Sequence, residues 1–218
     1  MRHRFVFFCL LVCALPAWAH DFWLKPDKDG AVLVYGHAGE NTPYERDVLK
    51  GVAGWSAQGK SVKVDSAYQG QTLHLVAPQA RTLAVDIDNR FWVKTVHGWK
   101  HHSKREQSSY LKSTWDLHYA KLVEGPDYTQ KVGHPLEIVL RSVGKTVEGQ
   151  VLLNGKPLPG AELYTEHKTV ATANAQGNFS LSRPDGLLVL KVEHIEPLVG
   201  NPDADTRVMY ATLTLPAK

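Results

Sequence analysis

TVEGQVLLNGKPLPGAEL, residues 146–163, is the most informative stretch of this chain for its fold class. It begins with Thr146–Leu153, a short run rich in Val and Leu, and Asn154-Gly155 follows directly. An Asn-Gly pair readily adopts the positive φ angles that a tight hairpin turn requires. The chain turns again at Pro159-Gly160 before a second short run, Glu162–Glu166. Short strands separated by such turns are typical of a small β-sandwich.

The same pattern continues on both sides of this stretch. Downstream, Leu187–His194 alternates apolar and polar residues after an Asp185-Gly186 turn. Upstream, short β-branched or alternating runs are bounded by Gly, Pro, Asn or Asp; they are Ala31–Tyr35, Thr72–Val76, Thr82–Ile87 and Leu136–Leu140. Residues 104–123 fit either a helical face or a strand, and we expect an irregular segment that enters a strand at Trp115.

These patterns predict an all-β protein in two sandwich-like parts, immunoglobulin-like or transthyretin-like. The boundary is expected near Ser142–Lys145, because short strands and turns follow one another more regularly after this point. We expect a signal peptide over residues 1–19, an N-terminal β domain over 20–142 and a C-terminal β-sandwich over 143–218.

The first nineteen residues have the features of a secretory signal peptide. Arg2 and Arg4 form a basic head, Phe5–Leu15 is apolar but too short to span a bilayer, and Ala17-Trp18-Ala19 offers small residues for cleavage. Neither cysteine lies in a lipidation motif, so we expect an exported protein in a bacterial periplasm that is not embedded in the membrane. Cleavage after Ala19 would make His20 the amino terminus.

Composition limits the function classes. The net charge of +3 falls to +1 without Arg2 and Arg4, so no polyanion-binding face is indicated and nucleic acid is not an expected partner. Both cysteines, Cys9 and Cys13, lie in the signal peptide. A metal site in the mature protein must therefore use nitrogen and oxygen ligands, and ten of the 11 histidines remain for that purpose.

Three histidines are candidate metal ligands. His20 at a free amino terminus can chelate one ion through its α-amine and its ring Nδ1, a pair of nitrogens that suits Ni(II), Co(II) or Cu(II). His37 lies between Gly36 and Gly39, where a predicted strand ends, and glycines permit close approach of the backbone. His194 has the parity of Leu188, Leu190 and Val192 and ends its strand.

A denser histidine cluster occurs at His97, His101 and His102. Lys100, Lys104 and Arg105 flank it, and added positive charge repels a cation, so a solvated loop is the favoured interpretation and a secondary metal site the alternative. His118 alternates with Tyr119 in a possible strand and has no assigned place.

Two resemblances add to these inferences. The segment NGKPLPGAEL…ANAQGNFSL…DGLLVLKV, within residues 145–195, resembles the carboxypeptidase regulatory-like domain, a small transthyretin-like sandwich. AHDFWLKP, VYGHAGE, DNRFWVKTVHGWKHHSK, LHYAKLV, GHPLEIVL and LKVEHIEP…YATLTL resemble the periplasmic accessory proteins of the nickel uptake transporter family. The second resemblance implies a two-part β protein that binds nickel or cobalt, supports uptake by a membrane importer, and uses His20, His37 and His194.

Two other functions stay open. An exported sandwich without metal could act as an adhesion or assembly module. An amino-terminal histidine chelate with a second histidine ligand is also the metal site of copper-dependent oxidative enzymes, and in that case the metal would be Cu(II). The chain has no nucleophile elbow, phosphate-binding glycine loop or zinc-protease helix motif, and we expect a binding protein rather than an enzyme.

Overall fold

A computed structural model describes residues 20–36, 41–125, 129–166 and 168–217. These residues form seventeen strands and two single-turn 3-10 helices, η1 (Arg46–Val48) and η2 (Lys104–Glu106). The prediction of an all-β, sandwich-like fold is confirmed. In the described ranges, no helix has the length and apolar character needed to cross a membrane.

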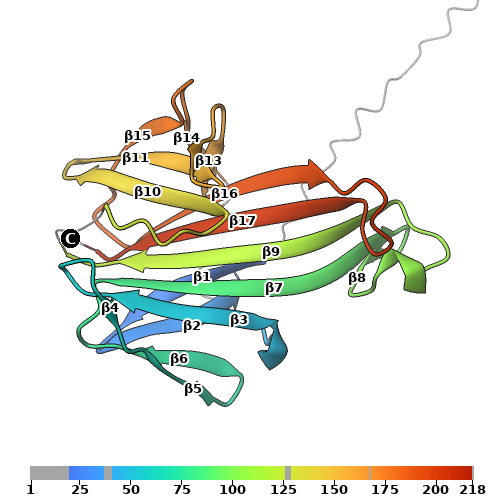
Figure 1. Cartoon of the computed structure of the whole chain (residues 1–218), viewed down its shortest axis with the longest axis horizontal. Helices are drawn as coiled ribbons and strands as arrows, with labels where there is room; N and C mark the ends of the chain where they lie inside the picture. Colours follow the sequence, from blue (N-terminus) through green and yellow to red (C-terminus); the bar gives the residue numbers. More distant parts are fainter. Residues whose placement is uncertain (1–19, 37–40, 126–128, 167, 218) are drawn as a thin grey trace, which may run out of the picture.

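A long, twisted sheet of nine strands forms the centre of the molecule (Figure 1). Its order is β14-β13-β16-β17-β9-β7-β3-β4, with β8 paired to β7. β17 runs parallel to β9, and the other strand pairs described in this sheet are antiparallel. The bounds are β3 (Leu49–Trp55), β4 (Ser61–Val62), β7 (Thr82–Thr95), β8 (Gly98–Lys100), β9 (Lys112–Val123), β13 (Glu162–Thr165), β14 (Lys168–Thr172), β16 (Leu188–Pro197) and β17 (Thr206–Leu215).

A four-stranded sheet covers part of one face of this central sheet. Its order is β1-β2-β6-β5, with β1 (Asp21–Asp27), β2 (Gly30–Gly36), β5 (Asp65–Gln69) and β6 (Thr72–Val76). The two layers bury an apolar core that includes Phe22, Leu33, Val85 and Leu122. Thr212 in β17 donates a hydrogen bond of 2.8 Å to the carbonyl of Phe22, which fixes β1 against the central sheet.

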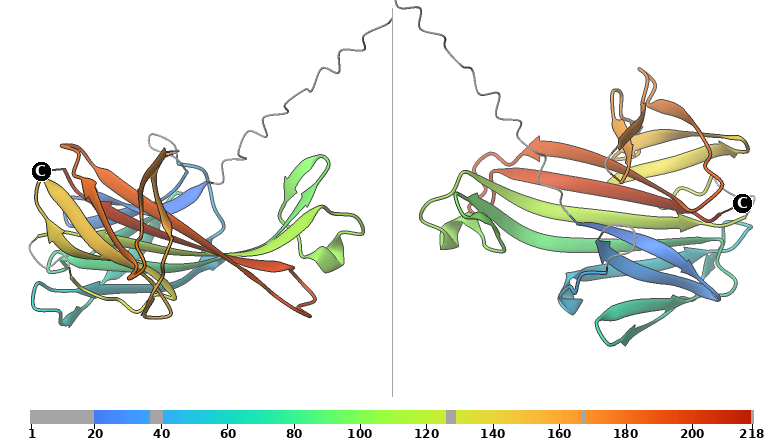
Figure 2. Two further views of the ribbon diagram at one scale, coloured as in Figure 1. Left: turned by 90° about the horizontal axis from the view of Figure 1, so that it is seen from above. Right: turned by 180° about the vertical axis from the view of Figure 1, so that it is seen from behind.

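A second small sheet covers the opposite face (Figure 2). It contains β10 (Leu136–Val143), β11 (Thr146–Leu153), β12 (Lys156–Pro157) and β15 (Asn178–Ser182). Its core includes Leu140, Val151, Leu163 and Met209. A buried ion pair, Lys121 Nζ to Glu137 Oε1 at 2.7 Å, joins it to β9.

The expected boundary, near Ser142–Lys145, falls where β10 ends and turns into β11, and these two strands pair with each other. The central sheet takes β3, β7 and β9 from before that turn, and β13, β16 and β17 from after it. The two halves of the sequence therefore share one sheet.

The predicted strands occur in the structure, and several of them differ in extent. Asn154 and Gly155 have φ angles of 50° and 75°, so the predicted hairpin turn is confirmed. β7 continues past Ile87 to Thr95, because a bulge at Asp88–Phe91, with Arg90 at φ 61°, bends the strand without ending it. β9 begins at Lys112 rather than at Trp115.

Candidate functional site

The long strands of the central sheet extend beyond both covering sheets (Figure 1). A cleft of about 980 Å³ lies on the face of this sheet that carries β1 and β2. The end of the β1–β2 hairpin forms one wall of this cleft. The loop before β13 and the strands β7 and β8 contribute other walls. Side chains of β9, β16 and β17 form its floor. The lining includes His20, Tyr35, Trp92, Asp116, His118 and Tyr210.

Alternation along β9 explains why the floor is polar. Thr114, Asp116 and His118 point to the same face as Ala120 and Leu122, because side chains two apart in a strand share a face. Ala120 and Leu122 are covered by the β1–β2 sheet and belong to its core. The three polar residues lie where that cover ends, so they face the cleft.

His118 is a nearly fully buried side chain, with 2% of its surface exposed. Its ring stacks on Tyr210 at 4.5 Å and meets Phe22 edge-on at 5.1 Å. Neither Nδ1 nor Nε2 has a hydrogen-bond partner among the described residues. Burial lowers the pKa of His118 to about 3, and the nearby charge of Lys191 acts in the same direction. The imidazole is therefore neutral at physiological pH.

Asp116 lies two residues before His118 on the same face. Burial raises the pKa of its carboxyl to about 6, and the charge of Glu193 raises it further, while contact with Thr114 lowers it. One carboxylate oxygen, Oδ1, is buried without a hydrogen-bond partner in the described part of the chain. At neutral pH this carboxylate is mostly ionised, despite its burial.

An ion pair fixes the hairpin end against the cleft floor. Lys191 Nζ in β16 lies 2.7 Å from Asp21 Oδ1 in β1 and 4.9 Å above the ring of Tyr210. Burial raises the pKa of both Tyr210 and Tyr35 above the ordinary value, so both phenols stay neutral. The His20 ring meets Tyr35 edge-on at 5.3 Å, which places His20 beside this cluster.

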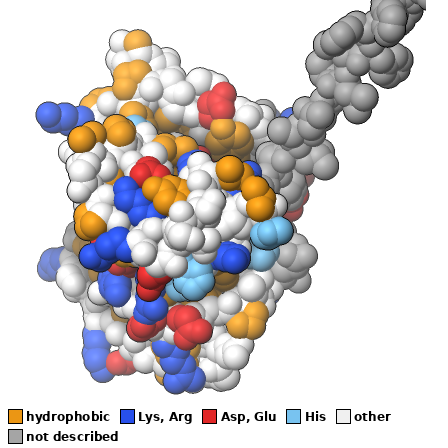
Figure 3. Space-filling model, turned by 90° about the vertical axis from the view of Figure 1, so that its right-hand side faces the viewer, with side chains coloured by type: hydrophobic (Ala, Val, Ile, Leu, Met, Phe, Trp, Pro, Cys, Tyr) orange, Lys and Arg blue, Asp and Glu red, His pale blue; other side chains and the backbone are white. Residues whose placement is uncertain are grey.

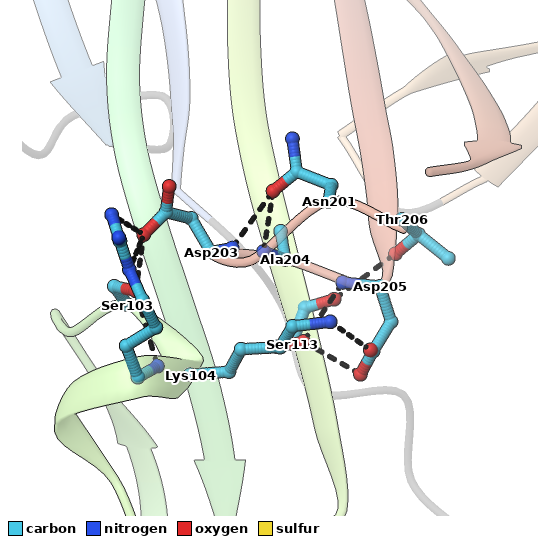
Figure 4. Close-up of polar contacts among 9 residues, drawn as sticks. Ser103, Lys104, Ser113, Asn201, Asp203, Ala204, Asp205 and Thr206 are labelled. Atoms are coloured by element: carbon cyan, nitrogen blue, oxygen red, sulfur yellow. Dashed lines mark hydrogen bonds and ion pairs between the residues drawn. The ribbon is translucent and has the colours of Figure 1, made fainter. Parts of the chain in front are cut away.

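A polar network holds the outer end of the central sheet in place (Figure 4). Asp203 accepts hydrogen bonds from Ser103 Oγ and Arg105 Nε, each at 2.7 Å. Asp205 accepts from Lys104 Nζ at 2.8 Å and from Ser113 Oγ at 2.6 Å. The contacts tie the turn at η2 and the start of β9 to the β16–β17 connection, and so support the strands that form the cleft floor.

The structure describes two of the three predicted metal ligands, His20 and His194. His20 lines the cleft, while His37 lies outside the described residues. The last described pair of the β1–β2 ladder joins Asp21 to Gly36, which are the immediate chain neighbours of His20 and His37. The metal site itself stays a prediction.

His194 lies opposite Met209 of the second core, whereas His118 lies opposite Tyr210. The two histidines therefore belong to opposite faces of the sheet. β13 pairs with β16 only at Lys191 and Val192, so His194 occupies an open edge and still lines the cleft. Its Nε2 lies 4.0 Å from Glu196 Oε2, and burial lowers its pKa.

The end of the molecule near β8 carries the other histidine cluster, and Figure 3 shows histidine side chains on this end among charged ones. His101 stacks on Trp92 at 4.9 Å, and His102 Nδ1 lies 3.9 Å from Glu106 Oε2. Among the described residues, no three His, Cys, Asp or Glu side chains are grouped so that they could hold a metal ion.

Sequence reasoning did not identify Asp116 and His118 as site residues. The available signal was the alternation Thr114-Asp116-His118-Ala120-Leu122, in which polar residues continue the apolar face of one strand. That pattern indicates a face that is covered at one end and open at the other.

Fold and site together define the class of protein. It is an all-β protein with a polar cleft beside the open end of the β1–β2 hairpin. Residues 17–196 match the family model described as domain of unknown function (DUF4198), and the chain belongs to this family. No curated protein and no solved structure shows significant similarity to the chain.

Proposed function

We propose that this protein is an exported, periplasmic binding protein for a divalent late transition metal, Ni(II) or Co(II). It supplies the bound metal to an importer in the membrane. Cu(II) is the alternative metal. The proposed ligands are the α-amine and imidazole of His20 after cleavage at Ala19, the imidazole of His37, and His194 as a third.

The pairing at the end of the β1–β2 hairpin carries this proposal. Asp21 and Gly36 are register partners, and in the sequence His20 directly precedes Asp21 and His37 directly follows Gly36. His20 and His37 are 17 positions apart in the sequence, yet each is the chain neighbour of one residue of the Asp21–Gly36 pair. Directly opposite residues of antiparallel strands lie about 4.5–5.5 Å apart, so the Asp21–Gly36 pair holds together the two chain positions next to these histidines.

The amino terminus should dominate affinity. Two nitrogens on one residue bind without the entropy cost of fixing two separate side chains. Ligand nitrogens must be deprotonated, so metal affinity should fall as the pH falls. The ion pair between Asp21 and Lys191, whose side chains are 16% and 18% exposed, keeps the neighbouring backbone in place before metal arrives.

The test compares the naturally processed protein with a variant that carries one additional residue before His20. Intact mass of protein recovered from the periplasm should correspond to residues 20–218. Titration calorimetry with Ni(II) should then show at least about tenfold weaker binding for the extended variant, or about 1.4 kcal/mol. His37→Ala should weaken binding by a similar factor.

The matched control is the double variant His101→Ala with His102→Ala, which removes two histidines from the exposed loop and should leave affinity unchanged. Equal nickel affinity of extended and natural protein would refute the chelate. Loss of affinity in the loop variant alone would place the metal at that loop. A protein that binds neither Ni(II), Co(II) nor Cu(II) would be an exported structural module.

A further inference from the structure

Two side chains on the floor of the cleft carry buried polar atoms without a hydrogen-bond partner in the described part of the chain. Both ring nitrogens of His118 and Oδ1 of Asp116 are buried and have no partner among the described residues. Leaving a buried polar group unpaired destabilises the folded protein, and a charged group more so. Native proteins contain few such groups, and here two of them lie two residues apart on one strand, facing one cleft.

The dimensions of the cleft fit an organic molecule rather than a bare ion. Clefts that hold small organic ligands have volumes of about 300–1,000 Å³, and this one is about 980 Å³. Its walls contain the aromatic side chains Tyr35, Trp92, Trp99 and Tyr164, in addition to Tyr210 on the floor. In the described part of the chain, Asp116 and His118 belong to no group of three potential metal ligands.

The charge of the lining selects a cation. Five carboxylates line the cleft, on Asp21, Asp116, Glu162, Glu166 and Glu193, against three lysines, Lys94, Lys112 and Lys191. Lys191 is paired with Asp21, and Lys94 lies over the ring of Trp99. Aromatic faces also attract cations, because the ring quadrupole places negative charge on the face.

We propose that the cleft binds a small organic cation that carries a primary ammonium group beside a ring. The ammonium donates to Asp116 Oδ1 and to the unprotonated ring nitrogen of His118, and the ring packs against the aromatic wall. Neutral His118 can accept one hydrogen bond and donate another, so a ligand with an acceptor next to its ammonium satisfies both ring nitrogens. This proposal does not depend on metal binding at His20.

The test uses three probes of matched shape on the full processed protein: 2-phenylethylamine, 2-phenylethanol and 3-phenylpropanoate. Binding is followed by calorimetry and by tryptophan emission, because Trp92 and Trp99 line the cleft. The amine should bind saturably and at least tenfold more tightly than the alcohol, and the carboxylate should not bind. Equal binding of all three probes, or no saturation by the amine, would overturn the proposal.

Two substitutions locate the site. Asp116→Asn keeps the shape of the side chain but removes its charge, and should weaken amine binding at least tenfold. His118→Phe keeps the ring stack on Tyr210 but removes the acceptor, and should also weaken it about tenfold. Asp65→Asn is the matched control, because Asp65 is exposed in β5 and pairs with Lys63 away from the cleft; it should have no effect.

Circular dichroism and thermal unfolding establish that each variant is folded. If Asp116→Asn does not fold, Glu193→Gln at the exposed side of the same lining serves instead, with an expected loss of at least threefold. Native-like amine affinity in the folded cleft variants would refute the assignment. If instead Asp116→Asn and His118→Phe abolish Ni(II) binding in the absence of amine, these residues are metal ligands and the organic site is wrong.

Discussion

Replacing His118 by Phe should stabilise the protein, and increasingly so as the pH falls. The His118 ring is 2% exposed, and its contacts with Tyr210 and Phe22 are ring contacts that a phenyl group can also make. At pH 7.5 the imidazole is neutral in both the folded and the unfolded chain. The substitution then removes only two unpaired ring nitrogens, which should raise the free energy of unfolding by about 1 kcal/mol.

The larger effect appears in acid. Burial lowers the pKa of His118 from its ordinary value of 6.5 to about 3 in the folded protein. Between these values the unfolded chain binds a proton that the folded chain does not, so the free energy of unfolding falls with falling pH. At pH 4.5, two units below the unfolded value, the cost is about 2.7 kcal/mol, from about 1.36 kcal/mol per unit. His118→Phe removes this cost.

The test is urea unfolding of the wild-type protein and of His118→Phe, at pH 7.5 and at pH 4.5, without added ligand. It measures how much the substitution changes the free energy of unfolding at each pH. Other titrating groups, Asp116 among them, are present in both proteins and largely cancel in the comparison. The stabilisation should be larger at pH 4.5 by about 2.7 kcal/mol. His97→Phe, at an exposed turn, is the control and should show little change at either pH. A stabilisation that is equal at the two pH values would refute the assignment of His118 as a buried, uncharged imidazole.

Two further predictions concern the contacts that hold the layers together. Lys121→Met would leave Glu137 buried without its partner and should lower the free energy of unfolding by about 3–5 kcal/mol, whereas Lys63→Met in an exposed pair should cost less than about 1 kcal/mol. Similar losses in urea unfolding of the two variants would contradict this difference. Ser113→Ala removes a hydroxyl that donates to Asp205 Oδ2 and accepts from the Asp205 amide, and should cost about 1–3 kcal/mol in the same measurement. Ser66→Ala, on an exposed strand, is its control, and an equal effect of the two substitutions would argue against the network in Figure 4.

The local structure of this protein follows closely from its sequence. Apolar periodicity and turn chemistry predicted β6 and β11 with their observed bounds, and the Asn154-Gly155 turn has the positive φ angles expected. β7 was predicted too short because Asp88-Asn89-Arg90 has the composition of a turn. Pairing with β9 on both sides of the bulge keeps this segment in the sheet, and that pairing is invisible in the local sequence.

The cleft, in contrast, depends on contacts between distant parts of the chain. Every residue of β9 is known from the sequence, but burial of Asp116 and His118 depends on β1, about ninety residues earlier, and on Tyr210, about ninety residues later. Local propensity sets which residues alternate along a strand. It does not set which strand lies beside it or where the covering hairpin ends. The sequence predicted His20 as a candidate ligand because the features of a signal peptide are local. His118 required the tertiary structure, because burial without a partner among the described residues is a property of the assembled layers.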